Sequence, residues 1–240
     1  MVYIIFGPTS SGKTSIATKL ASELNGELIS ADSRQVYRYM SIGTGQIDNP
    51  LGIHLTNFIE PNDIYSVAKW QKAAYYLIEN LKSRGKVPII VGGTGLYLDS
   101  LIYDRNYGNN VHPLLPIEIN LITPKITRDQ IYEKINKRVE IMFEQGFVKE
   151  VENLLERGYG KCKSIKGTGY KEITEYIGNR GKTILDFPEI INSLMPVRPP
   201  ILTLEECKEK VKIGYRNYAK RQLTWFRKYY TDFNIQEVSV

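Results

Sequence analysis

Apolar runs alternate with amphipathic stretches over the first half of the chain. Four runs have the length and composition of buried strands: Val2–Phe6, Glu27–Ser30, Val87–Val91 and Ile117–Ile122. Three stretches place apolar residues at helical spacing: Thr14–Leu24, Ser66–Ser83 and Leu96–Leu101. Strands that alternate with helices predict an α/β fold, in which helices cover a parallel sheet. In such sheets ligands bind beyond the carboxyl ends of the strands, so the residues after each strand are candidates for chemistry.

The pattern changes after residue 126, where helical periodicity replaces the alternation. Residues 127–158 and 204–230 predict two long helices. The proline-rich stretch 179–202 predicts an irregular segment with one short helix at Pro188–Leu194, and the composition of 104–116 predicts a loop. We therefore expect an α/β core at 1–126 and a C-terminal helical part at 127–240 that packs on the core.

The loop after the first strand carries a phosphate-binding pattern. Residues 7–14 read GPTSSGKT, which matches G-x-x-x-x-G-K-[ST] between a strand and a helix. In this setting backbone N–H groups turn onto phosphate oxygens, the lysine neutralises the distal phosphates and the last hydroxyl ligates Mg²⁺. The residues expected to bind the phosphates are Gly7, Thr9, Ser10, Ser11, Gly12, Lys13 and Thr14, with Thr14 as the Mg²⁺ ligand. The pattern predicts a P-loop NTPase-like fold, but it does not say whose phosphates are bound.

Two further strand ends carry candidate residues. Asp32 follows the second strand, on the same side as the P-loop, and is either a helix N-cap or a general base or magnesium ligand. The third strand ends in Gly92-Gly93-Thr94-Gly95, where the glycines indicate close backbone approach. This strand end has no acidic residue, which disfavours an ATP-hydrolysing motor.

The last helix is amphipathic in an unusual way. One face is basic and consists of Arg216, Lys220, Arg221, Thr224, Arg227 and Lys228. The other face is apolar and mostly aromatic, with Tyr215, Tyr218, Leu223, Trp225, Phe226 and Tyr229. We expect the basic face to bind a phosphate backbone and the aromatic face to pack on the core.

Length, charge, apolar runs and cysteine content limit the class of protein to which this chain can belong. The chain has 240 residues and a net charge of +6, and it contains no apolar run near the ~20 residues of a membrane span. Its start has no signal-peptide pattern. The two cysteines, Cys162 and Cys207, are far apart, so neither a zinc site nor a disulfide framework is predicted. The expected location is the reducing cytoplasm.

Three strings occur in an order that is specific to one family: ADSRQVY at 31–37, GGTGLY at 92–97 and KRQLTWFR at 220–227. With them the chain resembles the tRNA dimethylallyltransferase (tRNA isopentenyltransferase) family over most of its length. The resemblance implies transfer of a dimethylallyl group from its diphosphate to N6 of the adenosine on the 3′ side of the tRNA anticodon. It also implies a monomer and a shortened form of the family's helical insertion domain at 104–116.

The resemblance assigns roles to individual residues. Lys13 and the P-loop would stabilise the departing diphosphate, Asp32 would accept a proton from the attacking amine, Thr94 would orient the target nucleotide and Arg128 would clamp the diphosphate. The implied tRNA contacts are Asp32, Ser33, Arg34, Gln35, Lys166, Gly169, Tyr170, Lys171, Lys220, Arg221, Gln222, Thr224, Trp225 and Arg227. For Tyr170 and Trp225 a role in the core is an equal alternative, and for Arg128 the alternative is a surface arginine at the N-terminus of a helix.

Three other functions stay open from the sequence. An adenylate isopentenyltransferase that acts on free AMP, ADP or ATP would also be short, but it would not need the basic helix. A small-molecule kinase would bind ATP in the P-loop and leave ADSRQVY and GGTGLY without a role. A non-catalytic nucleic-acid-binding module would not be expected to retain Lys13, Thr14 and Asp32.

Overall fold

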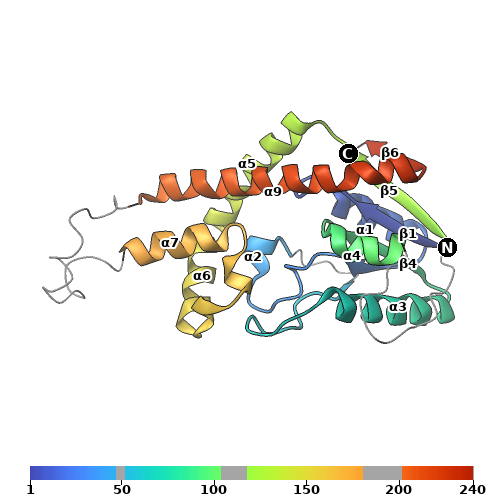
Figure 1. The fold of residues 1–240 in the computed structure, drawn as a ribbon, viewed down its shortest axis with the longest axis horizontal. Helices are drawn as coiled ribbons and strands as arrows, with labels where there is room; N and C mark the ends of the chain where they lie inside the picture. The colour runs from blue at the N-terminus through green and yellow to red at the C-terminus, as the bar shows by residue number, and fades with distance from the viewer. Residues whose placement is uncertain (47–51, 104–117, 181–201, 240) are drawn as a thin grey trace, which may run out of the picture.

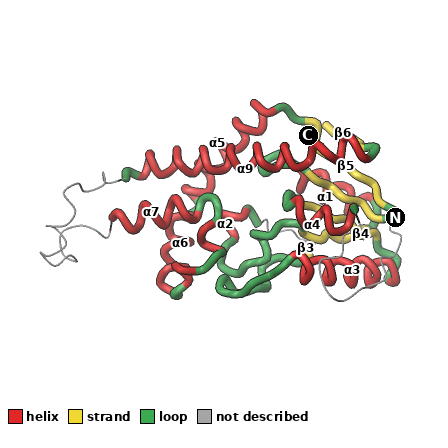
Figure 2. The backbone as a smooth tube through the Cα atoms, in the orientation of Figure 1, coloured by secondary structure: helices red, strands yellow, loops and turns green. Residues whose placement is uncertain are grey.

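The computed structural model describes residues 1–46, 52–103, 118–180 and 202–239 (Figure 1). Six parallel strands form one sheet in the order β3-β2-β4-β1-β5-β6 (Figure 2). Their bounds are β1 Val2–Phe6, β2 Gly26–Ser30, β3 Ile53–His54, β4 Val87–Gly92, β5 Ile119–Lys125 and β6 Ile235–Ser239. The predicted α/β fold with a parallel sheet is therefore confirmed.

Three of the helices that follow strands pack on this sheet. They are α1 Lys13–Glu23, α3 Val67–Ser83 and α4 Gly95–Ile102. Alternate residues of β1 face opposite layers: Ile5 packs with Ala17 and Ala21 of α1, whereas Ile4 and Phe6 belong to the core formed with α3, α4 and the last helix. Apolar residues thus fill both faces of the sheet, as expected for parallel strands.

The remaining helices build a second core beside the sheet. They are α2 Ser41–Thr44, α5 Arg128–Glu144, α6 Phe147–Glu156, α7 Tyr170–Arg180 and α9 Leu204–Asp232, with short 3-10 turns at Tyr159–Lys161 and Ser164–Lys166. Capping boxes at Thr127 with Gln130 and at Thr203 with Glu206 begin α5 and α9. Helix α9 extends from the helical end of the molecule to the sheet, where both chain termini lie (Figure 1). Its Cys207, Val211 and Tyr215 join the helical core, and its Phe226 and Tyr229 join the sheet core.

The carboxyl ends of three strands meet at one edge. Phe6 of β1 is in register with Gly92 of β4, and Ser30 of β2 with Val91. Beyond this edge the Thr94 amide donates to the Ala31 carbonyl at 3.0 Å. A β-carbon at Gly92 would lie 2.2 Å from the Ala31 carbonyl oxygen, so only glycine allows this approach. The P-loop, Asp32 and Thr94 are therefore neighbours, as the alternation of elements predicts.

Several predicted elements need correction. The single helix at 127–158 is wrong: Gly146, with φ 94°, interrupts it and separates α5 from α6. The sequence also misses α7, α2, β3 and β6, and β6 shows that the C-terminal part is not purely helical, because it pairs with β5. The predicted helix at 204–230 corresponds to α9.

Two sequence predictions lie outside the described residues. They are the short helix at Pro188–Leu194 and the loop at 104–116 with its shortened insertion. The division at residue 126 also stays a prediction. Within the described ranges, no helix is both long and apolar enough to cross a membrane.

Candidate active site

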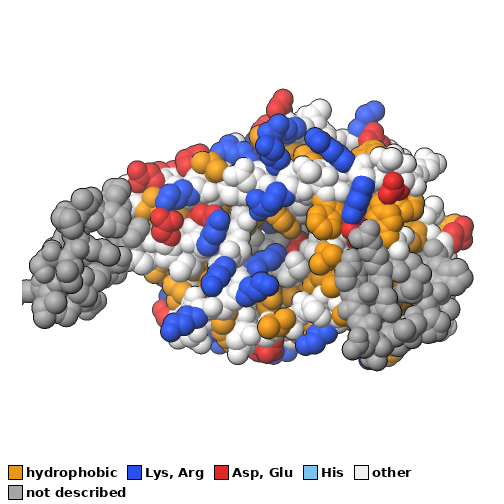
Figure 3. Space-filling model, viewed as in Figure 1, with side chains coloured by type: hydrophobic (Ala, Val, Ile, Leu, Met, Phe, Trp, Pro, Cys, Tyr) orange, Lys and Arg blue, Asp and Glu red, His pale blue; other side chains and the backbone are white. Residues whose placement is uncertain are grey.

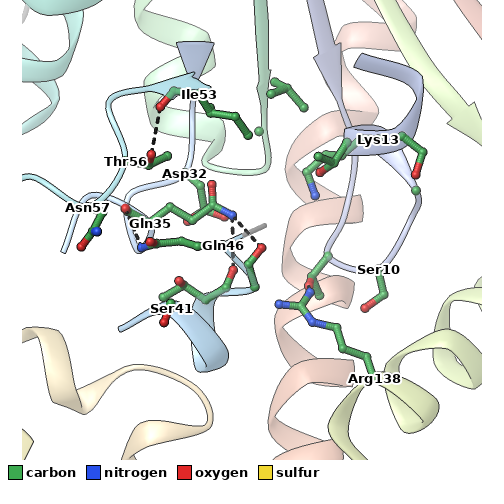
Figure 4. A pocket seen from close by; sticks show the side chains of 18 residues that line it. Ser10, Lys13, Asp32, Gln35, Ser41, Gln46, Ile53, Thr56, Asn57 and Arg138 are labelled. Atoms are coloured by element: carbon green, nitrogen blue, oxygen red, sulfur yellow. Dashed lines mark hydrogen bonds between the residues drawn. The ribbon is translucent and has the colours of Figure 1, made fainter. Parts of the chain in front are cut away.

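A cavity of about 920 Å³ opens at the carboxyl edge of the sheet. We call it the P-loop cavity. Its walls come from the P-loop, from Asp32 and Gln35, from residues 41–46 and 53–57, and from Arg138 of α5. Figure 4 shows Lys13, Ser10 and Arg138 on one side, with Gln35, Gln46 and Asn57 across from them. Cationic and amide groups thus face the same cavity.

The P-loop has the geometry of an anion cradle. Gly12 takes a left-handed conformation with φ 89°, and in the described structure no side chain caps the N-terminus of α1 that follows. Lys13 Nζ donates to the Pro8 carbonyl at 3.1 Å. The buried Oγ atoms of Ser10 and Ser11 have no hydrogen-bond partner within the described part of the chain. Unsatisfied buried hydroxyls beside an uncapped helix N-terminus suit a phosphate ligand.

Burial changes the acidity of Lys13. Desolvation lowers the pKa of its ammonium group from 10.5 to about 8, which the Asp32 charge partly offsets and the Arg138 charge reinforces. Lys13 is therefore mostly cationic at neutral pH but loses its charge under mildly alkaline conditions.

Hydrogen bonds to Ser33, the residue after Asp32, hold Thr94 close to Asp32. Asp32 Oδ1 accepts a hydrogen bond from the Arg34 amide at 2.8 Å, which orients the carboxylate. The Thr94 Oγ1 accepts from the Ser33 amide at 2.9 Å and donates to the Ser33 Oγ at 3.2 Å. Asp32 contributes to the cavity wall directly, whereas the contacts of Thr94 fix the residue that follows Asp32.

Arg138, and not Arg128, reaches the P-loop. The predicted clamp by Arg128 is not what the structure shows, because Arg128 is exposed and its Nε donates to its neighbour Tyr132 at 2.8 Å. Arg138 lies ten residues further along α5, about 15 Å along the helix axis. Its Nη1 donates to Thr9 Oγ1 at 2.8 Å and its guanidinium lies against Gly45. The sequence could have indicated Arg138, because it lies beside Ile135 and Val139 on the apolar, buried face of the helix.

A second cavity of about 310 Å³ adjoins the first. Thr9, Asp32, Thr44 and Arg138 line both cavities. Five cationic side chains line the second cavity, so we call it the basic cavity: Arg34, Arg138, Lys166, Lys171 and Arg221. Asp32 therefore lies at the boundary between the P-loop cavity and the basic cavity.

The family model described as IPP transferase matches residues 35–118 and 106–229. The chain belongs to the IPP transferase family. A tRNA dimethylallyltransferase from Caldanaerobacter subterraneus subsp. tengcongensis is 33% identical over 301 aligned positions, which cover 95% of this chain and 89% of that protein. The alignment exceeds the 240 residues of this chain, so the relative carries residues that this chain lacks.

Solved structures of the IPP transferase family have the same fold. The tRNA isopentenylpyrophosphate transferase of Bacillus halodurans superposes with a TM-score of 0.82 at 31% identity, covering 99% of this chain and 89% of that one. The corresponding enzyme of Staphylococcus epidermidis gives a TM-score of 0.77 at 28% identity, covering 100% and 93%. These likenesses extend over the P-loop, α5 and α9 together.

Half of the fourteen tRNA contacts expected from the sequence line the basic cavity. Its lining includes Asp32, Ser33, Arg34, Lys166, Tyr170, Lys171 and Arg221. Gln35 instead lines the P-loop cavity and binds Ser30 Oγ through its Oε1 at 3.0 Å. Lys220, Thr224 and Arg227 are exposed on α9. Figure 3, which shows the same side of the molecule as Figure 1, has Lys and Arg side chains spread over its middle, with few acidic side chains among them.

Three expected tRNA contacts are buried and have internal partners. Tyr170 is 1% exposed and its hydroxyl donates to Glu150 Oε1 at 2.8 Å, so most of its ring belongs to the core. The Gly169 amide donates to Glu172 Oε2 at 2.7 Å. Gln222 is 5% exposed, with both ends of its amide bonded inside the protein. In this structure the Gln222 side chain therefore faces the protein interior, and its contact with tRNA stays a prediction.

The two faces of α9 also need adjustment. Tyr215, Phe226 and Tyr229 are buried, as the aromatic face predicts, but Trp225 is 42% exposed. Lys228 leaves the basic face, because its Nζ forms an ion pair with the buried carboxylate of Asp99.

Proposed function

We propose that this chain is a tRNA dimethylallyltransferase. It transfers the dimethylallyl group of dimethylallyl diphosphate to N6 of the adenosine on the 3′ side of the anticodon. The observation that carries this proposal is the place of Asp32, at the junction of the P-loop cavity and the basic cavity. Membership of the IPP transferase family and the names of the relatives support the same reaction.

The diphosphate of the donor binds in the P-loop. Lys13 and Arg138 face it as cations, and the amides at the start of α1 add hydrogen-bond donors. These groups stabilise the negative charge that develops as the carbon–oxygen bond breaks and the diphosphate leaves with the electron pair. Preorganised donors in a partly desolvated site make this contribution large.

The acceptor adenine enters from the basic cavity. Its N6 attacks the allylic carbon, forms the new carbon–nitrogen bond and loses one proton to the Asp32 carboxylate. An adenine that is stacked in the anticodon loop cannot reach this position, so it leaves the stack first. Arg34, Lys171 and Arg221 provide charge for the phosphates that flank the flipped nucleotide.

Mg²⁺ fits the residues present, and we propose it as the cofactor. The Thr14 hydroxyl lines the P-loop cavity and is the ligand from this chain. In the described ranges no group of three or more His, Cys, Asp or Glu side chains could hold a metal, which suits an ion that takes its other ligands from phosphate and water. When bound, Mg²⁺ supplies charge neutralisation at the leaving diphosphate. We further propose a cytoplasmic monomer.

The test is transfer of label from radiolabelled dimethylallyl diphosphate with Mg²⁺. Unmodified tRNA, an anticodon stem-loop and AMP serve as parallel acceptors. We expect label in the two RNAs and none in AMP. Label in AMP alone would assign the chain to the adenylate-modifying enzymes, and an absence of label together with ATP-dependent phosphorylation would favour a kinase.

A further inference from the structure

Helix α9 contributes a buried side chain to the phosphate cradle. Gln222 Oε1 accepts a hydrogen bond from the Thr9 amide of the P-loop at 2.8 Å. Its Nε2 donates to the Gly93 carbonyl, in the loop after β4, at 2.9 Å. The side chain therefore joins two loops that lie far from it in sequence.

The chemistry of this bridge requires an amide. One end must accept from an N–H group and the other must donate to a carbonyl, and a glutamine side chain does both. An ionised carboxylate could serve only the first partner, and an aliphatic side chain neither. Because Gln222 is buried, either partner would lose its hydrogen bond without gaining one from bulk water.

The glycines after β4 allow α9 to come this close. A β-carbon at Gly93 would lie 2.2 Å from Gln222 Nε2, and one at Gly95 would lie 2.3 Å from the indole Cδ1 of Trp225. Real β-carbons do not approach so closely, so a side chain at Gly93 would displace the Gln222 amide and one at Gly95 would displace the Trp225 indole or shift α9. The close approach suggested by this glycine-rich sequence is thus an approach to Ala31 at Gly92 and to side chains of α9 at Gly93 and Gly95.

The two hydrogen-bond partners of Gln222 are in turn connected to Arg138 and to the loop that holds Asp32. Thr9, whose amide binds Gln222, also receives Arg138 Nη1 on its hydroxyl at 2.8 Å. Gly93 precedes Thr94, which holds Ser33 beside Asp32. Gln222 is therefore placed to keep the diphosphate-binding groups and Asp32 in register.

We propose that Gln222 is a positioning residue for the donor site and not a tRNA contact. It fixes the P-loop at Thr9 and the loop after β4 at Gly93, so that the cradle is preformed before the diphosphate arrives. The assignment rests on the proposed function, since it takes the diphosphate to be the P-loop ligand. It also makes one face of α9 part of the donor site, while its exposed residues face the acceptor.

The experiment measures binding of dimethylallyl diphosphate with Mg²⁺ by calorimetry, without tRNA, for the wild type, Gln222→Leu and Gln222→Glu. Binding of anticodon stem-loop RNA is measured separately at several salt concentrations. We expect Gln222→Leu to weaken donor binding about tenfold or more, and Gln222→Glu to weaken it less, while RNA affinity changes less than about twofold. In turnover, the KM for the donor rises and the KM for RNA does not.

Arg221→Ala is the matched comparison, because Arg221 is the adjacent residue of α9 and lines the basic cavity. It should show the reverse pattern, with weaker RNA binding and unchanged donor binding. Weaker RNA binding with normal donor binding in Gln222→Leu would overturn the inference. If that variant does not fold, Gly93→Ala provides the second test, since its β-carbon displaces the Gln222 amide; normal donor binding there would also overturn the inference. A wild type that binds no diphosphate would overturn the proposed donor site itself.

Discussion

Arg138 donates a hydrogen bond from Nη1 to the hydroxyl oxygen of Thr9 at 2.8 Å, across 129 residues of sequence. The contact brings a cation from the middle of α5 to the wall of the P-loop cavity. Lys13 is the other cation of that wall, so two positive charges from unrelated elements face one anion site.

Replacement of Arg138 by alanine should lower kcat/KM for the donor by roughly 10²–10³, because one charge that stabilises the leaving diphosphate is lost. Arg138→Lys should recover part of the activity, since it restores the charge but not the planar guanidinium. Steady-state kinetics with varied donor measure both. Arg128→Ala is the control and should stay within about threefold of the wild type. A loss at Arg138 no larger than the few-fold change expected at Arg128 would remove Arg138 from the clamp.

Asp32→Ala should abolish transfer while donor binding stays nearly intact. The reason is that Asp32 accepts the amine proton, whereas the P-loop holds the diphosphate. Single-turnover transfer and calorimetric donor binding separate the two functions. Asp32→Asn, which keeps the hydrogen bond from the Arg34 amide, should be equally inactive. Loss of donor binding in both variants would mean that Asp32 serves the metal or the loop instead.

Donor binding should weaken as the pH rises through about 8. The pKa of Lys13 in the free protein is lowered to about 8, so above this value the side chain becomes neutral and binding must first restore its proton. The diphosphate gains no charge in this range, since the last phosphate pKa is near 6. Affinity measured between pH 7 and 9.5 should fall by up to about tenfold per pH unit above 8. A flat profile would show that Lys13 does not carry the charge that binds the donor.

Glu150 should be important for stability although it lies outside the cavities. Its carboxylate accepts from the amides of Ile42 and Gly43 at 2.7 and 3.1 Å, and from the Tyr170 hydroxyl at 2.8 Å. Glu150→Ala should lower the free energy of unfolding by roughly 3 kcal/mol, since buried donors are left unpaired. Tyr170→Phe removes one of these bonds and should cost about 1 kcal/mol. Urea denaturation of both variants and the double variant tests this, and equal small losses would contradict it.

Arg221→Ala should raise the RNA concentration needed for half-maximal turnover and leave the rate at saturation unchanged. A lost phosphate contact lowers the slope of log affinity against log salt by about one. Filter binding of the anticodon stem-loop over a salt series gives this slope. An unchanged slope would exclude Arg221 from the phosphate contacts.

The sequence predicts best what neighbouring residues determine. The P-loop is recognisable because strand, glycine turn, lysine and helix follow one another within Val2–Glu23. The position of Asp32 beside it follows from a general property of parallel sheets. Neither inference needs knowledge of how distant segments pack.

The errors arise where distant segments meet. Arg128 and Arg138 lie on one helix, and only the packing of α5 against the P-loop decides which of them reaches the phosphate. Gln222 lies between basic neighbours, and helical periodicity does not reveal that two glycine-rich loops face it. Strand β6 was missed because three of its five residues are exposed, so it lacks a buried strand's apolar pattern.

The packing of β1 against α9 also has a consequence for folding during synthesis. Phe6 packs edge-on against Phe226 and Tyr229, with ring centroids 5.2 and 5.1 Å apart. A ribosome adds about 5–20 residues per second, so Phe226 and Tyr229 are synthesised roughly 10–40 s after Phe6. Until then the part of the sheet core that α9 contributes beside α3 and α4 is missing, and the amide of Thr9 lacks its Gln222 partner. A ribosome-bound chain that stops before α9 should therefore recruit chaperones and bind no diphosphate.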